Sequence, residues 1–369
     1  MKVVFAPDSF KGSLSSVQVA RALAVGWARA RPGDELVLAP LADGGEGTLD
    51  AIEAAGGWAR RSARVADPIR REIEATWLRR EGPDRVEVVV EMAAASGLSR
   101  LAAAERDPLG ATTLGTGQLL EAAITDGARS ITLGIGGSAT TDGGRGIVEA
   151  LGASVTESAG GAVAIDLEGL DRRLAHVELA VACDVDNPLL GGRGAAATYG
   201  PQKGASPDDV VALDSRLGRW ADALERATGR RERDTPGAGA AGGVGFALLC
   251  LQDRFASFAL RPGVELVMAA TGFDAALAEA DLVITGEGRI DAQTASGKTA
   301  LGVARRAHAA GVRCIAVGGN VEPEGAAALA AVDARAVPVH DRPVALDIAI
   351  AAGVSPIETR AGAIARSMT

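Results

Sequence analysis

Glycine and acidic residues occur together in three short stretches of the sequence. They are DSFKG (8–12), DGGEG (43–47) and GEGRID (286–291), and a short apolar run precedes each one. Glycine lets a phosphate approach the backbone, and carboxylates are ligands that Mg²⁺ prefers. The pattern therefore indicates a metal and phosphate site. The alternative is helix capping, since Asp43 and Glu46 alone could form a capping box.

Lysine is rare in this chain and occurs mostly beside glycine. Lysine and arginine together number 38, but only four are lysine, and three of these lie in DSFKG, GPQKGA and ASGKT. An ammonium is a compact point charge that a planar guanidinium does not replace. Lys11, Lys203 and Lys298 are therefore candidates for contacts with phosphate or substrate, with chance as the alternative.

Two further stretches have a composition suited to ligands. LGIGGSATTDGG (133–144) combines successive glycines with hydroxyls before an expected helix, as anion sites do. It also contains a weak dinucleotide pattern, G-x-G-x-x-A, with irregular spacing. In VACDVDNP, Asp184 and Asp186 follow an expected strand and could bind a metal or act as a general base, or could form an Asx-Pro turn.

The stretch AQTASGKT (292–299) matches the loose P-loop pattern. A true P-loop follows its strand directly, with glycines at the first and sixth pattern positions. Here Ala292 lies seven positions after Thr285, and the glycines come earlier, in GEG. We therefore expect the match to be incidental.

The arrangement of apolar runs predicts an α/β fold. Strand-like runs at VVFAP, ELVLAPLA, DLVIT and RCIAV each lead through a glycine loop toward a helix or the next turn, which is typical of one parallel sheet. Ser15 and Gln18 predict a capping box for a helix whose apolar face includes Val17, Ala20, Leu23, Ala24 and Trp27. The middle of the chain differs, with charged, antiparallel segments over 59–90 and a polar helix over 207–228. We therefore predict one domain inserted into another.

Composition excludes several classes of protein. A net charge of -9 over 369 residues disfavours nucleic acid and anionic membranes as partners. The three cysteines are separated, and no apolar run reaches the ~20 residues of a membrane span. We expect a cytoplasmic protein with reduced thiols. The scattered histidines and the absence of a G-x-S-x-G motif disfavour histidine-dependent hydrolysis.

Taken in order, seven motifs resemble the bacterial glycerate kinase family that includes glycerate 2-kinases. They are APDSFKGSLSS, PLADGGEGT, GIGGSATTDGG, ACDVDNPL, GPQKGA, PGAGAAGGVG and ITGEGRIDAQTASGKT, and the resemblance runs from Met1 to about Asn320. It implies ATP-dependent phosphorylation of D-glycerate to 2-phosphoglycerate with Mg²⁺. It also implies a Rossmann-like domain built from both chain ends (1–60 and 275–369), an inserted flavodoxin-like domain (61–274), and an active site in the cleft between them.

The motifs and the resemblance together give a set of candidate roles. Phosphoryl transfer needs cations, a metal and a group that accepts the hydroxyl proton. The candidates are Lys11, Asp43, Asp184, Asp291 and Lys298 for catalysis; Gly136, Gly137, Ser138, Thr140, Lys203, Gly286 and Glu287 for the nucleotide; Asp8, Ser9, Gly44, Gly45, Glu46 and Arg289 for the substrate; and Asp184 and Asp186 for the metal. Which aspartate acts as base and which binds Mg²⁺ stays open. The family usually lacks a hydroxyl residue at the position of Thr299, so a Mg²⁺ role there is doubtful.

Three alternatives stay open at this point: a glycerate 3-kinase, an NAD(P)-dependent oxidoreductase of a small hydroxy acid, and a binding module without catalysis. A monomer or a homodimer fits the sequence equally well.

Overall fold

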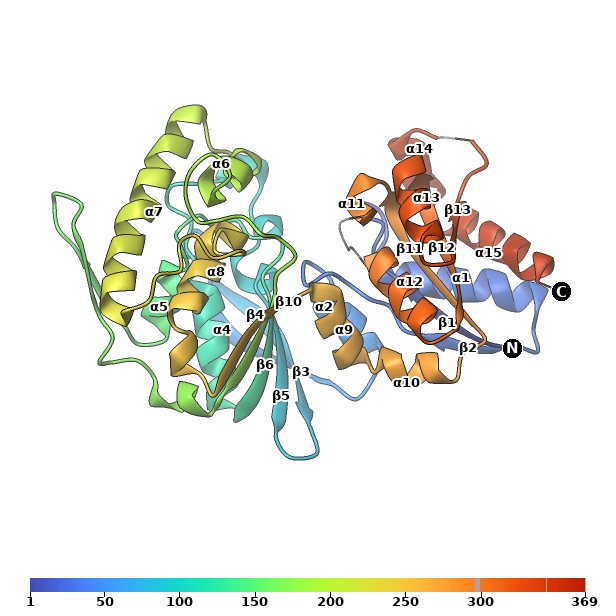
Figure 1. The fold of residues 1–369 in the computed structure, drawn as a ribbon, viewed down its shortest axis with the longest axis horizontal. Coiled ribbons are helices and arrows are strands. Elements are labelled where there is room, and N and C mark those ends of the chain that lie inside the picture. The colour runs from blue at the N-terminus through green and yellow to red at the C-terminus, as the bar shows by residue number, and fades with distance from the viewer. Residues whose placement is uncertain (296–298, 343, 369) are drawn as a thin grey trace. The chain divides into compact units, whose positions relative to one another are not determined.

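The computed structural model describes residues 1–295, 299–342 and 344–368, and the chain divides into two compact units (Figure 1). Unit 1 comprises Met1–Asp43, Asp50–Gly57 and Val264–Thr369, and unit 2 comprises Gly44–Leu49 and Trp58–Gly263. The predicted domain limits, 1–60 with 275–369 and 61–274, stay a prediction.

Unit 1 contains a parallel sheet with the strand order β13–β12–β11–β1–β2. Its strands are β1 (Lys2–Pro7), β2 (Glu35–Leu38), β11 (Leu282–Ile290), β12 (Arg313–Val321) and β13 (Ala334–Pro338). The prediction that strand-like runs from both ends of the chain form one sheet is confirmed.

Helices cover both faces of this sheet. Val3 and Phe5 pack with Trp27 on one face, and Val4 is equally buried, as expected for a parallel strand covered on both sides. Figure 1 shows α1 and α15 on one face and α12 and α13 on the other. The helices of unit 1 are α1 (Ser16–Ala30), α10 (Phe273–Ala278), α11 (Ala292–Ala295), α12 (Thr299–Ala309), α13 (Pro323–Ala330), α14 (Leu346–Ala352) and α15 (Ser355–Ser367). Two helices include residues of both units: α2 (Thr48–Ala54) and α9 (Gly263–Thr271), of which only Gly263 belongs to unit 2.

The predicted capping box at the start of α1 is confirmed. The Ser15 hydroxyl accepts from the Gln18 N–H at 3.2 Å, and the Gln18 side chain accepts from the Ser15 N–H at 2.9 Å. The predicted apolar face needs a small rotation. Ala20, Leu23 and Trp27 are buried as expected, but Val17 and Ala24 are half-buried, and Val19 takes a core position instead.

The strands β11 and β12 are longer than the sequence predicts. GEGRI lies within β11 and GGN within β12, where we expected loops. Glycine permits this extension because the neighbouring backbones come very close. A Cβ on Gly286 would lie 2.3 Å from the Val317 carbonyl oxygen, and one on Gly319 would lie 2.6 Å from the Gly288 carbonyl oxygen.

Unit 2 contains a mixed sheet with the strand order β10–β9–β6–β5–β4–β3. β3, β4 and β5 pair antiparallel, as predicted for residues 59–90, and β5, β6, β9 and β10 pair parallel. The strands are β3 (Ala59–Ala66), β4 (Glu72–Glu81), β5 (Val86–Glu91), β6 (Ala128–Gly134), β9 (Glu178–Ala182) and β10 (Ser257–Arg261), with a separate hairpin of β7 (Ser154–Glu157) and β8 (Val163–Asp166).

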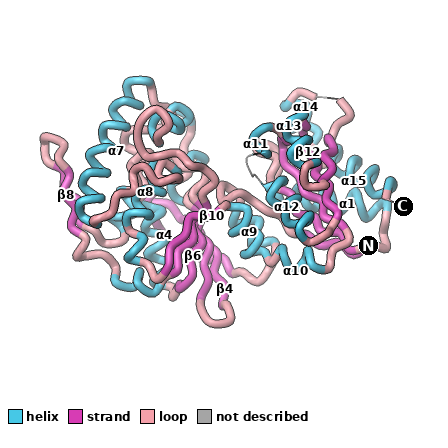
Figure 2. The backbone as a smooth tube through the Cα atoms, viewed as in Figure 1, coloured by secondary structure: helices cyan, strands magenta, loops and turns pink. Residues whose placement is uncertain are grey.

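The helices of unit 2 pack on this sheet, and Figure 2 separates helix, strand and loop along the chain. They are α3 (Ala93–Ser96), α4 (Leu114–Thr125), α5 (Arg145–Ala150), α6 (Ala195–Tyr199), α7 (Pro207–Thr228) and α8 (Ala240–Cys250). Short 3-10 turns are η1 (Leu98–Arg100), η2 (Ala103–Glu105), η3 (Arg172–His176), η4 (Pro201–Lys203) and η5 (Gln252–Arg254). The predicted polar helix over 207–228 is confirmed as α7. Among the described residues, no helix is long and apolar enough to cross a membrane.

Candidate active site

The carboxyl edge of the unit 1 sheet brings most of the predicted acidic residues of that unit together. Asp8 directly follows β1, and Glu287 lies near the end of the neighbouring strand β11, where Gly286 pairs with Pro7. Ligands of open parallel sheets bind at this edge. The loop lysine and carboxylates therefore meet because of strand order rather than because of proximity in the sequence.

These residues line one cavity of about 660 Å³ in unit 1. That volume lies within the range of small-ligand sites. Seven of the predicted site residues line it: Asp8, Ser9, Lys11, Asp43, Glu287, Arg289 and Asp291. One wall is apolar and comes from the C-terminal part of the chain, with Val339, Val344 and Ile357.

Lys11 provides an ammonium among the carboxylates of this cavity. Its Nζ lies 3.1 Å from Asp43 Oδ2. Desolvation lowers the pKa of Lys11, but the charges of Asp43, Asp8 and Glu287 raise it, and the net shift is upward. Lys11 therefore stays a cation at neutral pH and can bind an anionic group of a ligand.

Asp8 is the buried carboxyl of the cavity. It is 6% exposed, and its oxygens accept from the Ser9 N–H and from the Thr299 hydroxyl, each at 2.6 Å. Burial and the nearby charge of Asp43 raise the pKa of Asp8, and the Thr299 and Ser9 donors with Lys11 only partly offset this. A carboxyl with a raised pKa is better matched to taking a hydroxyl proton than an ordinary aspartate.

Glu287 and Asp291 are held by local hydrogen bonds. Glu287 accepts from the Thr294 hydroxyl at 2.7 Å, and Asp291 Oδ1 accepts from the Gln293 N–H at 2.7 Å. Arg289 lies 3.1 Å from Asp291 Oδ2 and also pairs with Glu322. Asp291 thus caps the turn into α11, and its catalytic role stays a prediction.

In unit 2, the glycine loop after β6 is organised around a buried lysine. Lys203 is 1% exposed, and its ammonium donates to Ser138 Oγ at 2.9 Å and to the Thr140 carbonyl oxygen at 2.5 Å. Burial lowers the pKa of Lys203 to about 7, although the charge of Asp142 opposes this. The sequence placed Lys203 at the nucleotide, but its charged end is directed at the protein.

This loop keeps several donors without an acceptor. Across residues 1–295, 299–342 and 344–368, no group accepts from the backbone N–H of Gly137, Ser138, Thr140 or Thr141. Among the described residues, the buried hydroxyls of Thr140 and Thr141 likewise have no hydrogen-bond partner. Gly137 is exposed and has φ +72°, and Ser138 is 8% exposed, so this end of the loop is the part that a ligand can reach. Unpaired N–H groups at such a position are suited to binding an anion.

The DGGEG loop packs against the same glycine loop inside unit 2. The Gly44 carbonyl accepts from the Gly136 N–H at 3.2 Å, and a Cβ on Gly136 would lie 2.6 Å from Gly45 Cα. These glycines are therefore required by backbone packing, whatever else they do. Glu46 is exposed, and its substrate contact stays a prediction.

The two aspartates after β9 are less constrained. Asp184 accepts from the Gly263 N–H at 3.0 Å, while Asp186 is 80% exposed and lies 3.7 Å from Arg193. In the described part of the chain, no cluster of three or more His, Cys, Asp or Glu side chains is arranged to hold a metal. The metal roles of Asp184 and Asp186 stay a prediction.

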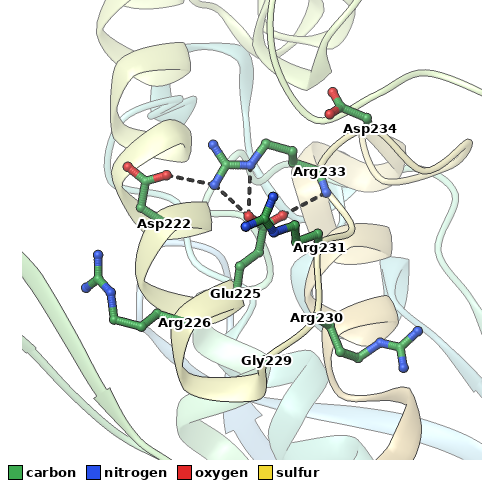
Figure 3. A pocket seen from close by; sticks show the side chains of 8 residues that line it. All are labelled: Asp222, Glu225, Arg226, Gly229, Arg230, Arg231, Arg233 and Asp234. Atoms are coloured by element: carbon green, nitrogen blue, oxygen red, sulfur yellow. Dashed lines mark hydrogen bonds and ion pairs between the residues drawn. The ribbon is translucent and has the colours of Figure 1, made fainter.

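A second cavity, of about 580 Å³, lies at the end of α7 in unit 2 (Figure 3). Arg233 is held between Asp222 and Glu225, each within 2.7 Å. Figure 3 shows Arg226 and Arg230 directed away from this centre. These ion pairs therefore stabilise the turn after α7. The charged side chains do not point toward a common centre, which does not fit an active site.

Sequence reasoning missed several residues that shape the two sites. Thr294 and Thr299 hold carboxylates in unit 1, and Asn320 and His340 line its cavity. In unit 2, Glu91 anchors the DGGEG loop by accepting from the N–H groups of Gly47 and Leu49 at 3.3 and 3.1 Å. The threonines carried a signal, because both lie inside a motif, but Glu91 ends a strand with no motif around it. Lys298 lies outside the described residues.

Parallel sheets, a charged cavity at a sheet edge and a glycine loop with N–H donors are typical of α/β enzymes that bind phosphorylated ligands. The sequence profile of the glycerate kinase family matches residues 3–369. A curated glycerate kinase of Bacillus subtilis is 42% identical over 359 residues, covering 92% of each chain. A glycerate 2-kinase of Escherichia coli is 42% identical over 315 residues, covering 82% of this chain and 81% of the relative.

A solved structure agrees with these relatives. It is described as a candidate glycerate kinase 2 from Salmonella typhimurium LT2, with a TM-score of 0.83 and 40% identity over 100% of this chain and 98% of that chain. The protein belongs to the glycerate kinase family and is a kinase. The resemblance seen in the sequence motifs is confirmed.

Proposed function

We propose that the protein is a glycerate 2-kinase, which transfers the terminal phosphate of ATP to the 2-hydroxyl of D-glycerate with Mg²⁺ as cofactor. The observation that carries this proposal is the unit 1 cavity, in which the Lys11 ammonium and the buried Asp8 carboxyl lie together. Glycerate presents the complementary groups, a carboxylate and hydroxyls. The family membership and the name of the Escherichia coli relative support the choice of substrate.

In unit 1, Lys11 binds the glycerate carboxylate or the transferred phosphate. Asp8, Ser9 and Arg289 position the substrate, and a carboxylate of the group Asp8, Asp43 and Asp291 accepts the hydroxyl proton. The deprotonated hydroxyl oxygen then bonds to the terminal phosphorus of ATP, as the bond between that phosphorus and the oxygen of ADP breaks. Because phosphoryl transfer depends on positioning and charge, no covalent enzyme intermediate is needed.

In unit 2, we assign the phosphates of ATP to the loop with Gly136, Gly137 and Ser138. Asp184 and Asp186 supply oxygen ligands of the kind that Mg²⁺ takes. Mg²⁺ usually binds one or two protein carboxylates together with phosphates and water, so a cluster of three is not required. The metal supplies charge neutralisation on the phosphates. We also propose a cytoplasmic location, to which the free Cys183, Cys250 and Cys314 are suited.

The test is a product assay with a matched pair of lysine variants. ADP release should require D-glycerate and Mg²⁺, and phosphorus NMR should identify 2-phosphoglycerate. Lys11→Ala should lose activity by at least about tenfold, the size of one charge-assisted contact. Lys2→Ala should not, because Lys2 lies at the opposite end of β1 and pairs with Glu35 and Glu279. A 3-phosphoglycerate product would contradict the regiochemistry. NAD(P)H turnover without ADP release, or glycerate binding without turnover, would contradict the kinase proposal.

A further inference from the structure

We propose that Lys203 is a positioning residue. By donating a hydrogen bond to the Ser138 hydroxyl, it directs the hydroxyl proton toward a bound phosphate, and it does not itself contact the ligand. The inference rests on the proposed nucleotide site in unit 2. It concerns how that site is organised, and it replaces the direct nucleotide contact that the sequence suggested for Lys203.

The argument begins with the chemistry of the two groups. An ammonium has three N–H donors and no acceptor, and a serine hydroxyl has one donor and two lone pairs. Because Lys203 donates to Ser138 Oγ at 2.9 Å, the hydroxyl must act there as an acceptor. Its own proton is therefore free to donate elsewhere, and Ser138 has no other hydrogen-bonded side-chain partner among the described residues.

The backbone beside Ser138 presents donors as well. The N–H groups of Gly137 and Ser138 have no acceptor in the described part of the chain, and Gly137 is exposed. The end of the loop thus offers two N–H groups and one O–H group and no competing acceptor that the structure identifies. Donors of this kind match a phosphate, which accepts hydrogen bonds and donates few.

Burying the Lys203 ammonium costs folding free energy, which a role in anion binding would explain. No carboxylate forms an ion pair with its ammonium among the described residues, and burying an ion costs several kcal/mol before compensation. An apolar residue of similar length would fill the same space at less cost. An anion bound across Ser138 would add a counter-charge at a distance of one side chain, beside the charge of Asp142.

The protonation state of Lys203 also decides which group donates in its hydrogen bond with Ser138. As a neutral amine, Lys203 gains a lone pair, and the Ser138 hydroxyl can then donate to Nζ instead of to the ligand. Burial lowers the pKa of Lys203 to about 7. The other charged groups near this site are Asp142, which opposes that shift, Arg216, which donates to the Thr141 carbonyl, and Arg106, which donates to the Gln202 carbonyl. Phosphate affinity should therefore fall as the pH rises above about 7.

The test is a double-mutant cycle on binding, read by calorimetry with Mg-ATP and with inorganic tripolyphosphate. Ser138→Ala and Lys203→Met should each weaken binding about 10- to 100-fold, the loss expected for a hydrogen bond to a charged group. The double variant should be no weaker than either single variant. Ser138→Thr keeps the hydroxyl and should bind within a few-fold of wild type. Additive losses would mean that Lys203 contacts the ligand directly, and would overturn the proposal.

Two further readouts separate positioning from simple support of the fold. With Mg-ATP as the probe between pH 7.5 and 9.5, above the phosphate pKa of about 6, wild-type affinity should fall with pH more steeply than the Ser138→Ala affinity. Lys203→Gln retains donors for Ser138 and Thr140 and should bind better than Lys203→Met. If Lys203→Met does not fold, Ser138→Ala against Ser138→Thr still decides, and equal affinities would refute the proposal.

The two probes also keep this inference distinct from the proposed function. Binding of tripolyphosphate without binding of ATP, with the same pattern among variants, would support the role of Lys203 and contradict the kinase. Binding of neither probe by the wild type would refute the inference. A kinase with wild-type affinity in both Ser138→Ala and Lys203→Met would leave the proposed function intact and remove the inference.

Discussion

Thr299→Val removes one hydroxyl from the neighbourhood of Asp8 and changes the shape of the side chain very little. The hydroxyl donates to Asp8 Oδ2 at 2.6 Å, and Thr299 is fully buried. This donor stabilises the ionised form of Asp8 and thus lowers its pKa, against the upward effects of burial and Asp43. Without it, the pKa of Asp8 must rise further above its ordinary value.

The size of this effect on Asp8 follows from the strength of its hydrogen bond with Thr299. A hydrogen bond to a charged group contributes about 1.5–3 kcal/mol, and one pKa unit corresponds to about 1.4 kcal/mol. Loss of this donor therefore destabilises the ionised form of Asp8 by about 1.5–3 kcal/mol and raises its pKa further. If the ionised carboxylate is the form that receives the substrate hydroxyl, activity is lost as the pH falls through this pKa. The acid limb of the pH profile should then move to higher pH.

The assay is kcat/KM for D-glycerate across the acid range, with carbon-13 NMR titration of the labelled aspartates as a direct check. Thr299→Ser is the matched control, because it keeps the hydroxyl and loses only the methyl group. Its limb should coincide with that of the wild type. An unchanged limb in a folded Thr299→Val protein would refute the reasoning about Asp8, and so would near-normal turnover by Asp8→Asn.

Two predictions concern the fold of unit 1. Gly286→Ala places a Cβ 2.3 Å from the Val317 carbonyl oxygen and should destabilise the protein by about 1–3 kcal/mol in urea unfolding. The control is Gly33→Ala, whose Cβ meets no atom of the described residues within 4 Å and which should change stability by less than about 1 kcal/mol. Equal effects of the two variants would contradict the packing argument. Burial raises the pKa of Asp34, but hydrogen bonds from Arg31, Trp27 and the N-terminal ammonium outweigh it and hold the pKa at about 2. Since this folded-state pKa is below the ordinary 3.8, the stabilisation is present above pH 3.8 and is lost as the pH falls toward 2. Asp34→Asn should remove that part of the acid dependence, and an unchanged slope of unfolding free energy against pH would count against the assignment.

Helices and strands could be predicted from the sequence where short-range patterns alone determine them. Ser15 and Gln18 identify the start of α1 because a capping box is a local interaction. Antiparallel pairing over 59–90 and the helix over 207–228 likewise follow from patterns within the segments themselves. The lengths of β11 and β12 could not be predicted, because the glycines that look like loop residues serve an approach between strands far apart in the chain.

The candidate site divides in the same way. Convergence of Asp8, Lys11 and Glu287 follows from strand order and the motifs that carry them. The burial of Lys203 could not be foreseen, because its acceptors Ser138 and Thr140 lie about 65 residues away in the chain. A glycine-flanked lysine predicts a contact with an acceptor, but the sequence does not say whether the acceptor belongs to a ligand or to the protein.

The place of β1 has a consequence for biosynthesis. β1 lies between β2 and β11, and β11 is synthesised only after most of the chain. At about 5–20 residues per second, a nascent β1–β2 pair waits on the order of ten seconds or longer with one edge open. An open apolar strand edge can pair with other chains. We therefore expect β1 to need protection by a ribosome-associated chaperone until β11 has been synthesised.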